Sequence, residues 1–132
     1  MKVFRLQIVT PKGIYREDEV EIVNLRTPLG QIGILANHIP FAGTIEISQM
    51  NYICNGKREE FAVAAGMFYV SDNQITIFTN AIEAKDEIDL LRAMKSKERA
   101  EKILSMQPEH IDILRAEASL QRALVRINLK NT

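Results

Sequence analysis

The distribution of glycine and proline constrains this chain most, because it divides the sequence into two halves with different structural preferences. All six glycines lie at or before Gly66, and three of the four prolines lie in the same half. The last 48 residues contain no glycine and 18 charged residues, of which 10 are basic and 8 acidic. Glycine and proline punctuate short strands and turns, whereas a glycine-free, charge-rich segment is typical of surface helices. The sequence therefore predicts a β domain over residues 1–84 and a helical domain over residues 85–132.

The first half contains several short segments with the alternation of β-strands. Apolar and polar residues alternate over 4–8, and residues 20–27 give a second strand. The dipeptide Asn55-Gly56 separates two strand-like runs and supplies the two positive-φ residues of a type I′ hairpin. Residues 67–79 predict another hairpin around a polar turn. Many short strands with frequent turns favour a β-sandwich or a β-barrel.

The second half predicts two helices, about 87–105 and 108–128, packed as an antiparallel hairpin. Asp86 is the predicted cap of the first helix, and Pro108 is the predicted first position of the second. An alanine-rich stripe at helical spacing lets the two helices pack closely, but such a pair buries little area. We therefore expect the hairpin to dock only marginally on the β domain. The stripe comprises Ile113, Ala116, Leu120, Ala123, Leu124 and Ile127.

The two predicted helices repeat each other at an offset of 23 residues. IDLLRAMKSKERA (88–100) and IDILRAEASLQRA (111–123) are identical at eight of thirteen positions. Positions seven apart share a helix face, so the arginines form two basic stripes. These stripes have two interpretations: solvated faces with Asp–Arg ion pairs, or an anion site in which guanidinium groups hold phosphate. The stripes are Arg92 and Arg99 on the first helix, and Arg115, Arg122 and Arg126 on the second.

The composition excludes several classes of function. The formal net charge is zero, which argues against a nucleic-acid binder that neutralises phosphates. Cys54 is the only cysteine, so no internal disulfide forms, and two histidines with one cysteine give no metal-site spacing. Neither a phosphate-binding loop nor an activated nucleophile is recognisable, which disfavours a small hydrolase. No apolar run approaches the ~18 residues of a membrane helix, and the N-terminus lacks a signal-peptide core.

The stretch GQIGILANHIP (30–40) is unusual because it is mostly apolar yet contains two glycines and a proline. Gly30, Gly33 and Pro40 are unfavourable inside a strand and inside a helix. The sequence therefore predicts a shaped turn here, with His38 as a turn or contact residue.

This stretch resembles the G-E-[LI]-G-[IL]-L-x-x-H-x-P segment of epsilon subunits of F-type ATP synthases. VTPKGIY near the start, AAGMFYVSDNQITIFTNAIEA (64–84) and IDLLRA at the start of the helical half follow the family's order and spacing. The resemblance covers nearly the whole chain. It implies an α+β fold in which a ten-stranded β-sandwich (1–84) is followed by an antiparallel α-helical hairpin (85–132). Two departures are Gln31, where many relatives have Glu, and Met67, which replaces the second glycine of a Gly-Gly-Phe motif.

The resemblance also implies a role. The chain would be a non-catalytic subunit of the central stalk, bound to the gamma subunit and the c ring and peripheral to the cytoplasmic face of a bacterial cell membrane. Gln31 and His38 would contact the c ring. The hairpin would inhibit ATP hydrolysis by meeting the alpha and beta subunits. The alternative is a free-standing β-sandwich adaptor, or a nucleotide-sensing protein outside the synthase.

Some bacterial relatives bind ATP through a motif written [IL]-D-x-x-R-A. The resemblance therefore implies that ATP is a regulatory ligand that is bound and not cleaved, and no cofactor is required. The arginines would face the phosphates, whereas the two acidic residues would serve the adenine or ribose end or orient Arg92. The implied ATP-binding residues are Glu83, Ile88, Asp89, Arg92, Ala93, Arg99, Arg122 and Arg126.

Overall fold

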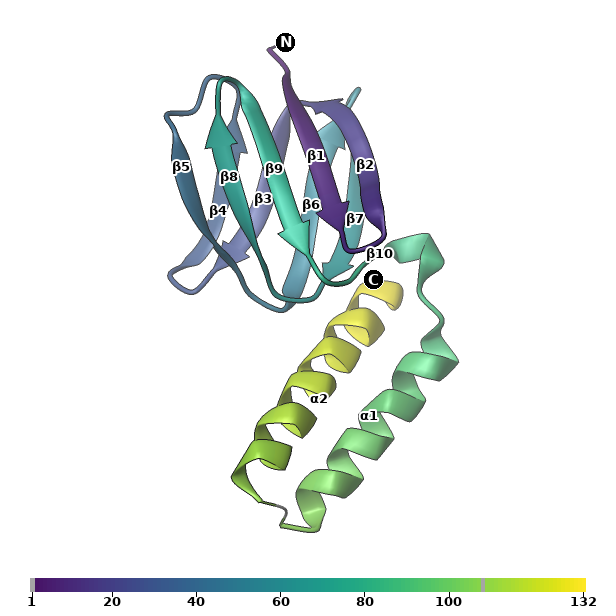
Figure 1. The fold of residues 1–132 in the computed structure, drawn as a ribbon. Coiled ribbons are helices and arrows are strands. Elements are labelled where there is room, and N and C mark those ends of the chain that lie inside the picture. The colour runs from purple at the N-terminus through teal and green to yellow at the C-terminus, as the bar shows by residue number, and fades with distance from the viewer. Residues whose placement is uncertain (1, 108) are drawn as a thin grey trace.

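The computed structural model describes residues 2–107 and 109–132, and it contains a β-sandwich followed by two helices (Figure 1). The α+β architecture with ten strands and a helical hairpin is confirmed. One sheet has the order β2 (Gly13–Val20), β1 (Phe4–Thr10), β9 (Gln74–Thr79), β8 (Gly66–Ser71), β5 (Phe41–Ile45). The other has the order β10 (Ile82–Ala84), β7 (Lys57–Val63), β6 (Ser48–Cys54), β3 (Ile22–Thr27), β4 (Gly30–Leu35).

The core lies between the two sheets and follows from strand alternation. In β1 and β6 every second side chain of the first five is buried, as expected where one face of a sheet packs inward. All strand pairs are antiparallel except β1 with β9, which are parallel neighbours. The largest side chains that are almost fully buried include Tyr52, Phe61, Phe68, Leu6, Ile8 and Ile77.

Two hairpin turns have the backbone that their sequences predict. Asn55 and Gly56 have φ angles of 52° and 74° between β6 and β7, which confirms the type I′ hairpin. The turn between β8 and β9 is built in the same way, because Asp72 and Asn73 have φ angles of 52° and 58°. Met67 lies in β8 with its side chain 57% exposed, so this position accepts a side chain in place of glycine.

The predicted turn over residues 30–40 is wrong in its first half. Gly30–Leu35 is β4, which pairs with β3 at the edge of its sheet, and only the residues after Leu35 form a loop. An edge strand tolerates glycine because one of its sides forms no backbone hydrogen bonds with a neighbouring strand. Gly30 has a φ of +126° where the chain leaves the β3–β4 turn, so it serves the turn and not the strand interior.

The first α-helix begins later than predicted. A short 3-10 helix, η1 (Lys85–Glu87), precedes α1 (Leu90–Ser105), and Asp89 rather than Asp86 caps α1: its Oδ1 accepts from the backbone N–H of Arg92 at 3.1 Å. Residues 87–89 therefore lie outside the α-helix. The second helix, α2, runs over His110–Lys130, two residues beyond the predicted end. The predicted role of Pro108 lies outside the described residues.

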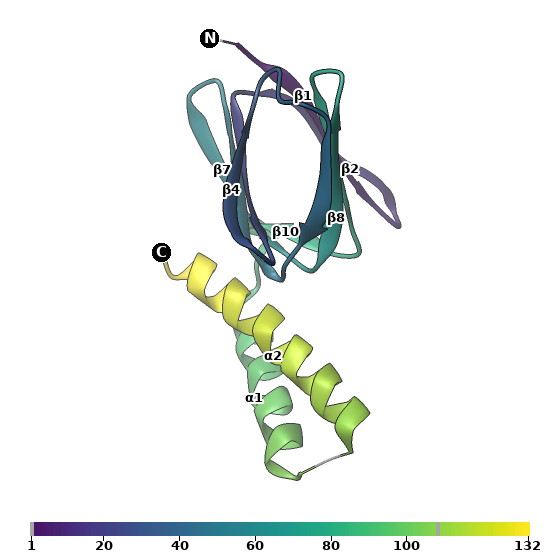
Figure 2. The same ribbon diagram turned by 90° about the vertical axis from the view of Figure 1, so that its left-hand side faces the viewer.

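The hairpin projects from one end of the sandwich and touches it through the C-terminal half of α2 (Figures 1 and 2). The predicted stripe is buried only in part: Ala116 and Ala123 are buried, whereas its four larger residues are half-buried. Val125 and Leu129, outside the stripe, pack on the sandwich with Ala62 and Ile88. In the part of the chain that the structure describes, neither helix combines the length and apolarity of a membrane span.

Candidate functional site

A groove of about 650 Å³ runs between α1 and α2. Four arginines line it, together with two serines and a single acidic residue, so its surface is strongly positive. Its lining residues are Ser96, Arg99, Ala100, Ile103, Asp112, Arg115, Ala116, Ser119, Arg122 and Arg126.

The 23-residue repeat explains how the groove forms. Ala93 and Ala100 on α1, and Ala116 and Ala123 on α2, occupy equivalent positions of the repeat and are all at most 4% exposed. Because alanine has a minimal side chain, the two helices approach closely along this line. The longer residues beside it are left to flank the groove. The repeat is therefore a packing device as well as a charge pattern.

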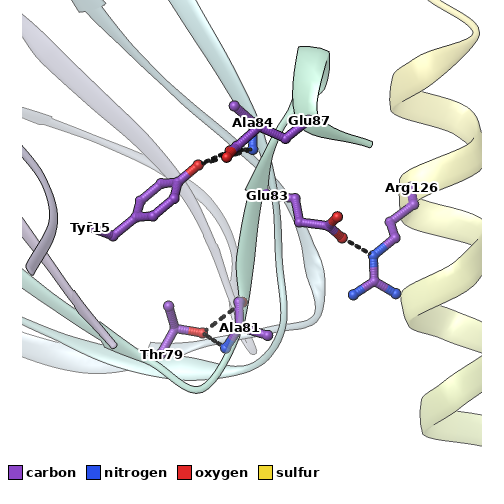
Figure 3. A network of polar contacts seen from close by, with 7 residues as sticks. All are labelled: Tyr15, Thr79, Ala81, Glu83, Ala84, Glu87 and Arg126. Atoms are coloured by element: carbon purple, nitrogen blue, oxygen red, sulfur yellow. Dashed lines mark hydrogen bonds and ion pairs between the residues drawn. The ribbon is translucent and has the colours of Figure 1, made fainter. Parts of the chain in front are cut away.

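The four arginines of the groove differ in their side-chain hydrogen bonds. Arg99 and Arg122 each donate to a serine one helical turn earlier on the same helix, at 3.3 Å and 3.0 Å. Arg126 forms an ion pair with Glu83, which comes from β10, and Figure 3 shows this pair bridging the sandwich and α2. No side-chain hydrogen bond joins Arg115 to another described residue, although it lines the same groove.

A second set of contacts fixes the junction between sandwich and hairpin. The hydroxyl of Tyr15 on β2 donates to the carboxylate of Glu87 in η1, and the backbone N–H of Ala84 donates to the same carboxylate at 2.8 Å (Figure 3). Lys85 Nζ donates to the Thr132 carbonyl at 2.7 Å, which ties the C-terminal end of the chain to η1.

The electrostatics of this junction shift two pKa values. Burial, and then the hydrogen bond to Glu87, raise the pKa of Tyr15 to about 12. The hydrogen bonds from Tyr15 and from the Ala84 backbone lower the pKa of Glu87 below its usual range, because they stabilise the carboxylate.

The outer face of the sheet β2-β1-β9-β8-β5 carries exposed apolar side chains. Met67 in β8 lies opposite Phe78 in β9. Val9 in β1 lies opposite Phe78 on one side and opposite Ile14 in β2 on the other. Ile14, Phe78 and Met67 are 58%, 46% and 57% exposed. We call these four residues the sheet-face row. A row of this kind crossing four strands is typical of a protein-binding surface.

Comparison with known proteins gives two matching family models that together span nearly the whole chain. Residues 3–85 match the ATP synthase, Delta/Epsilon chain, beta-sandwich domain, and residues 86–131 match the long alpha-helix domain of the same chain. The chain belongs to the ATP synthase delta/epsilon family. The chains of this family that are named epsilon chain are non-catalytic subunits of the synthase.

Individual relatives agree with this assignment. The chain is 46% identical to the ATP synthase epsilon chain of Desulfitobacterium hafniense (strain Y51), over 95% of this chain and 94% of the relative. It is 38% identical to the epsilon chain of Nitratidesulfovibrio vulgaris (strain DP4), over 98% and 96%. The fold is similar to a chain of the Euglena gracilis mitochondrial ATP synthase, with a TM-score of 0.82 and 20% identity over 96% of this chain and 80% of the other.

The structure of this delta/epsilon family member brings four of the eight sequence-predicted ATP residues together. Arg99, Arg122 and Arg126 line the groove, and Glu83 forms an ion pair with the lining residue Arg126. Arg115 is not among the ATP-binding residues predicted from the sequence, although it belongs to the basic stripe on α2. That stripe was the signal that could have found it.

The other four predicted residues form the [IL]-D-x-x-R-A motif and lie outside the groove lining. Three of them have structural roles: Ile88 packs with Val125 and Leu129, Asp89 caps α1, and Ala93 is buried between the helices. Arg92 is exposed.

The two predicted c-ring residues lie at opposite ends of β4. Gln31 pairs with Arg26 next to the β3–β4 turn, where Leu29 is fully exposed. His38 lies in the loop after β4, where its Nδ1 donates to the Ile39 carbonyl at 2.8 Å and its ring lies 5.9 Å from that of Phe41. The strand separates them by roughly 13 Å or more at ~3.3 Å per residue.

Proposed function

We propose that this epsilon-type subunit connects the gamma subunit to the c ring in the central stalk and regulates ATP hydrolysis through its hairpin. The observation that carries the proposal is the contrast within one chain between a fully packed sandwich and a hairpin docked by a few side chains. The sandwich supplies fixed partner surfaces, whereas the hairpin can leave its position without unfolding the rest. As part of the synthase the chain is peripheral, at the cytoplasmic face of the cell membrane.

The sheet-face row is the surface that we assign to gamma. Its side chains come from four adjacent strands whose backbones are fixed by pairing, so the surface is preformed. Apolar contact with a rotor partner needs such a preformed face, because torque applied to a mobile loop would deform the loop first. Replacing Met67 or Phe78 by Asp should therefore weaken co-purification with gamma.

The edge strand β4 is the surface that we assign to the c ring. Because Gln31 and His38 lie at its two ends, a contact that includes both must run along this edge and not across one end of the sandwich. Gln31 carries no charge, so the contact at this position is a hydrogen bond or packing and not an ion pair.

The groove between α1 and α2 is the site that we assign to ATP. Guanidinium groups bind phosphate oxygens with paired hydrogen bonds, and three of the four groove arginines come from α2. ATP bound there would hold the helices together and keep Arg126 beside Glu83. At low ATP the hairpin would extend along gamma, where its basic residues meet acidic surfaces of the alpha and beta subunits.

The energy of binding is sufficient for such a switch. A ligand at ~100 times its dissociation constant stabilises the bound state by ~2.7 kcal/mol. In the described part of the chain, the buried residues of the second apolar cluster, which docks the hairpin, are Ala62, Ile88, Val125 and Leu129. The free energy of a docking contact of this size is in the range that ATP binding can offset.

The proposal is tested by a pull-down from membranes with the full-length chain and a variant truncated after residue 84, followed by ATPase measurement. We expect both forms to recover gamma and c subunits, and only the full-length chain to inhibit ATPase activity at low ATP. Titration calorimetry of the isolated full-length chain tests the ATP site. Failure to recover gamma would favour the free-standing adaptor, and no heat or hairpin protection at millimolar ATP would remove the sensing role.

A further inference from the structure

Two matched side-chain hydrogen bonds lie in the groove, one on each helix. Ser96 accepts from Nη2 of Arg99 on α1 at 3.3 Å, and Ser119 accepts from Nη2 of Arg122 on α2 at 3.0 Å. The second pair is the first displaced by the 23 residues of the repeat. All four residues line the groove, and both serines are half-buried.

Each serine restricts the arginine that follows it by three positions. Residues three apart lie on the same side of a helix, which places the serine hydroxyl within reach of the guanidinium. The bond uses one of the five N–H groups of the guanidinium and leaves the others available to an anion. A long arginine side chain that is held in this way loses less conformational freedom when a ligand binds.

We propose that Ser96 and Ser119 are positioning residues that preset Arg99 and Arg122 as two phosphate-binding arms, one on each helix. The inference rests on the proposed function of the groove as an ATP site. Because the arms belong to different helices, a phosphate chain that reaches both links α1 to α2. The serines therefore tie ligand affinity to closure of the hairpin without touching the ligand themselves.

Serine-to-alanine variants of the full-length chain test the proposal by ATP titration calorimetry. We expect Ser96→Ala and Ser119→Ala each to weaken ATP binding by about 2- to 10-fold, the contribution of one hydrogen bond, and the double variant to weaken it further. Ser119→Thr keeps the hydroxyl and should restore affinity close to wild type. Ser105→Ala is the matched control, because Ser105 donates to the Lys102 carbonyl at 2.7 Å outside the groove lining.

Helix content separates positioning from a merely structural role. Alanine has the higher helix propensity, so the variants should keep their circular dichroism and their unfolding midpoint while affinity falls. A parallel loss of helix content and affinity would overturn the positioning role. In the unliganded chain, NMR order parameters of Arg99 and Arg122 Nε should exceed that of Arg92 and fall in the variants; equal mobility would overturn the preset arms.

The remaining outcomes distinguish this proposal from the ATP site itself. If the wild-type chain binds ATP and both alanine variants bind it equally well, the serines have no positioning role and the ATP site stands. If the wild-type chain does not bind ATP at all, the ATP site and the preset arms fail together.

Discussion

The sandwich and the hairpin are held together by different amounts of apolar packing. The sandwich core in the described part of the chain contains 18 buried residues, among them Tyr52, Phe61 and Phe68. The contact that docks the hairpin contains four, two of which lie on α2. Among the described residues, the buried side chains between the two helices are alanines, which bury little area each. One chain therefore combines a rigid body with an appendage whose position is set by small energies.

We expect the greatest loss of stability from a substitution in the core of the sandwich. Phe61 is fully buried and stacks on Tyr52 with ring centroids 5.4 Å apart. Replacing Phe61 by Ala should reduce the free energy of unfolding by about 3–5 kcal/mol, because it removes a large apolar side chain and leaves a cavity. Urea denaturation measures this loss. Phe78→Ala is the matched control, since Phe78 is 46% exposed and should cost about 1 kcal/mol or less.

The next effect concerns the contact that docks the hairpin on the sandwich. Leu129 is fully buried against the sandwich, and replacing it by Ala should weaken docking by about 2–3 kcal/mol. We expect faster hydrogen exchange and proteolysis of α1 and α2, with unchanged exchange in β1, β6 and β9. Leu91→Ala, at a position 72% exposed, should change neither. Equal loss of protection in both domains would show that they unfold as one unit.

A glycine in the sandwich gives a third, smaller effect. A Cβ added at Gly66 would lie 2.2 Å from the Phe78 carbonyl oxygen, which belongs to the backbone of the neighbouring strand. Gly66→Ala should therefore cost about 1–3 kcal/mol in thermal or urea unfolding, because β8 and β9 must separate. Gly33→Ala should cost less, since the nearest atom there is the end of the Asn24 side chain at 3.1 Å. A larger loss at Gly33 would contradict this ranking.

Much of this fold could be predicted from the sequence because its signals are local. Strand alternation over residues 4–8 and the Asn55-Gly56 turn depend only on neighbours along the chain. The strand Gly30–Leu35 could not be predicted in this way, because its glycines are tolerated only through its place at the edge of the sheet. The start of α1 was missed for a related reason: Asp86 and Asp89 are both good caps, and the 3-10 turn held by Tyr15 selects the second.

The candidate site likewise combines features that are visible in the sequence with features that depend on the fold. The repeat and the arginine stripes are visible in the sequence, and they predict a basic groove between two helices. The Glu83–Arg126 pair joins residues 43 positions apart, so its bond depends on how α2 docks. The motif residues Ile88, Asp89 and Ala93 illustrate the opposite case. Their resemblance to an ATP motif predicts ligand contact, and this stays a prediction; in the structure Ile88 and Ala93 are packed and Asp89 caps α1.

The smallest effect tests the bond that links η1 to the sandwich. The pKa of Tyr15 is raised to about 12, so its stabilising contribution is complete below pH ~10 and is lost as pH rises from ~10 to ~12. The pKa of Glu87 is lowered, so its contribution is complete above pH ~4.5 and is lost as pH falls through that lower pKa. Tyr15→Phe removes the bond and should cost about 0.5–1 kcal/mol at pH 7.

The pH dependence of this loss is the decisive part of the measurement. Urea unfolding of wild type and Tyr15→Phe should differ at pH 7 and converge toward pH 12, where the wild-type tyrosinate repels the Glu87 carboxylate. The variant should still lose stability in alkali, because burial and the hydrogen bond to Asp18 also raise the pKa of Tyr52. Tyr69→Phe, at a position 54% exposed, serves as the control and should leave stability unchanged at pH 7. A difference between wild type and Tyr15→Phe that stays constant from pH 7 to pH 12 would mean that the hydroxyl does not hold η1 against the sandwich.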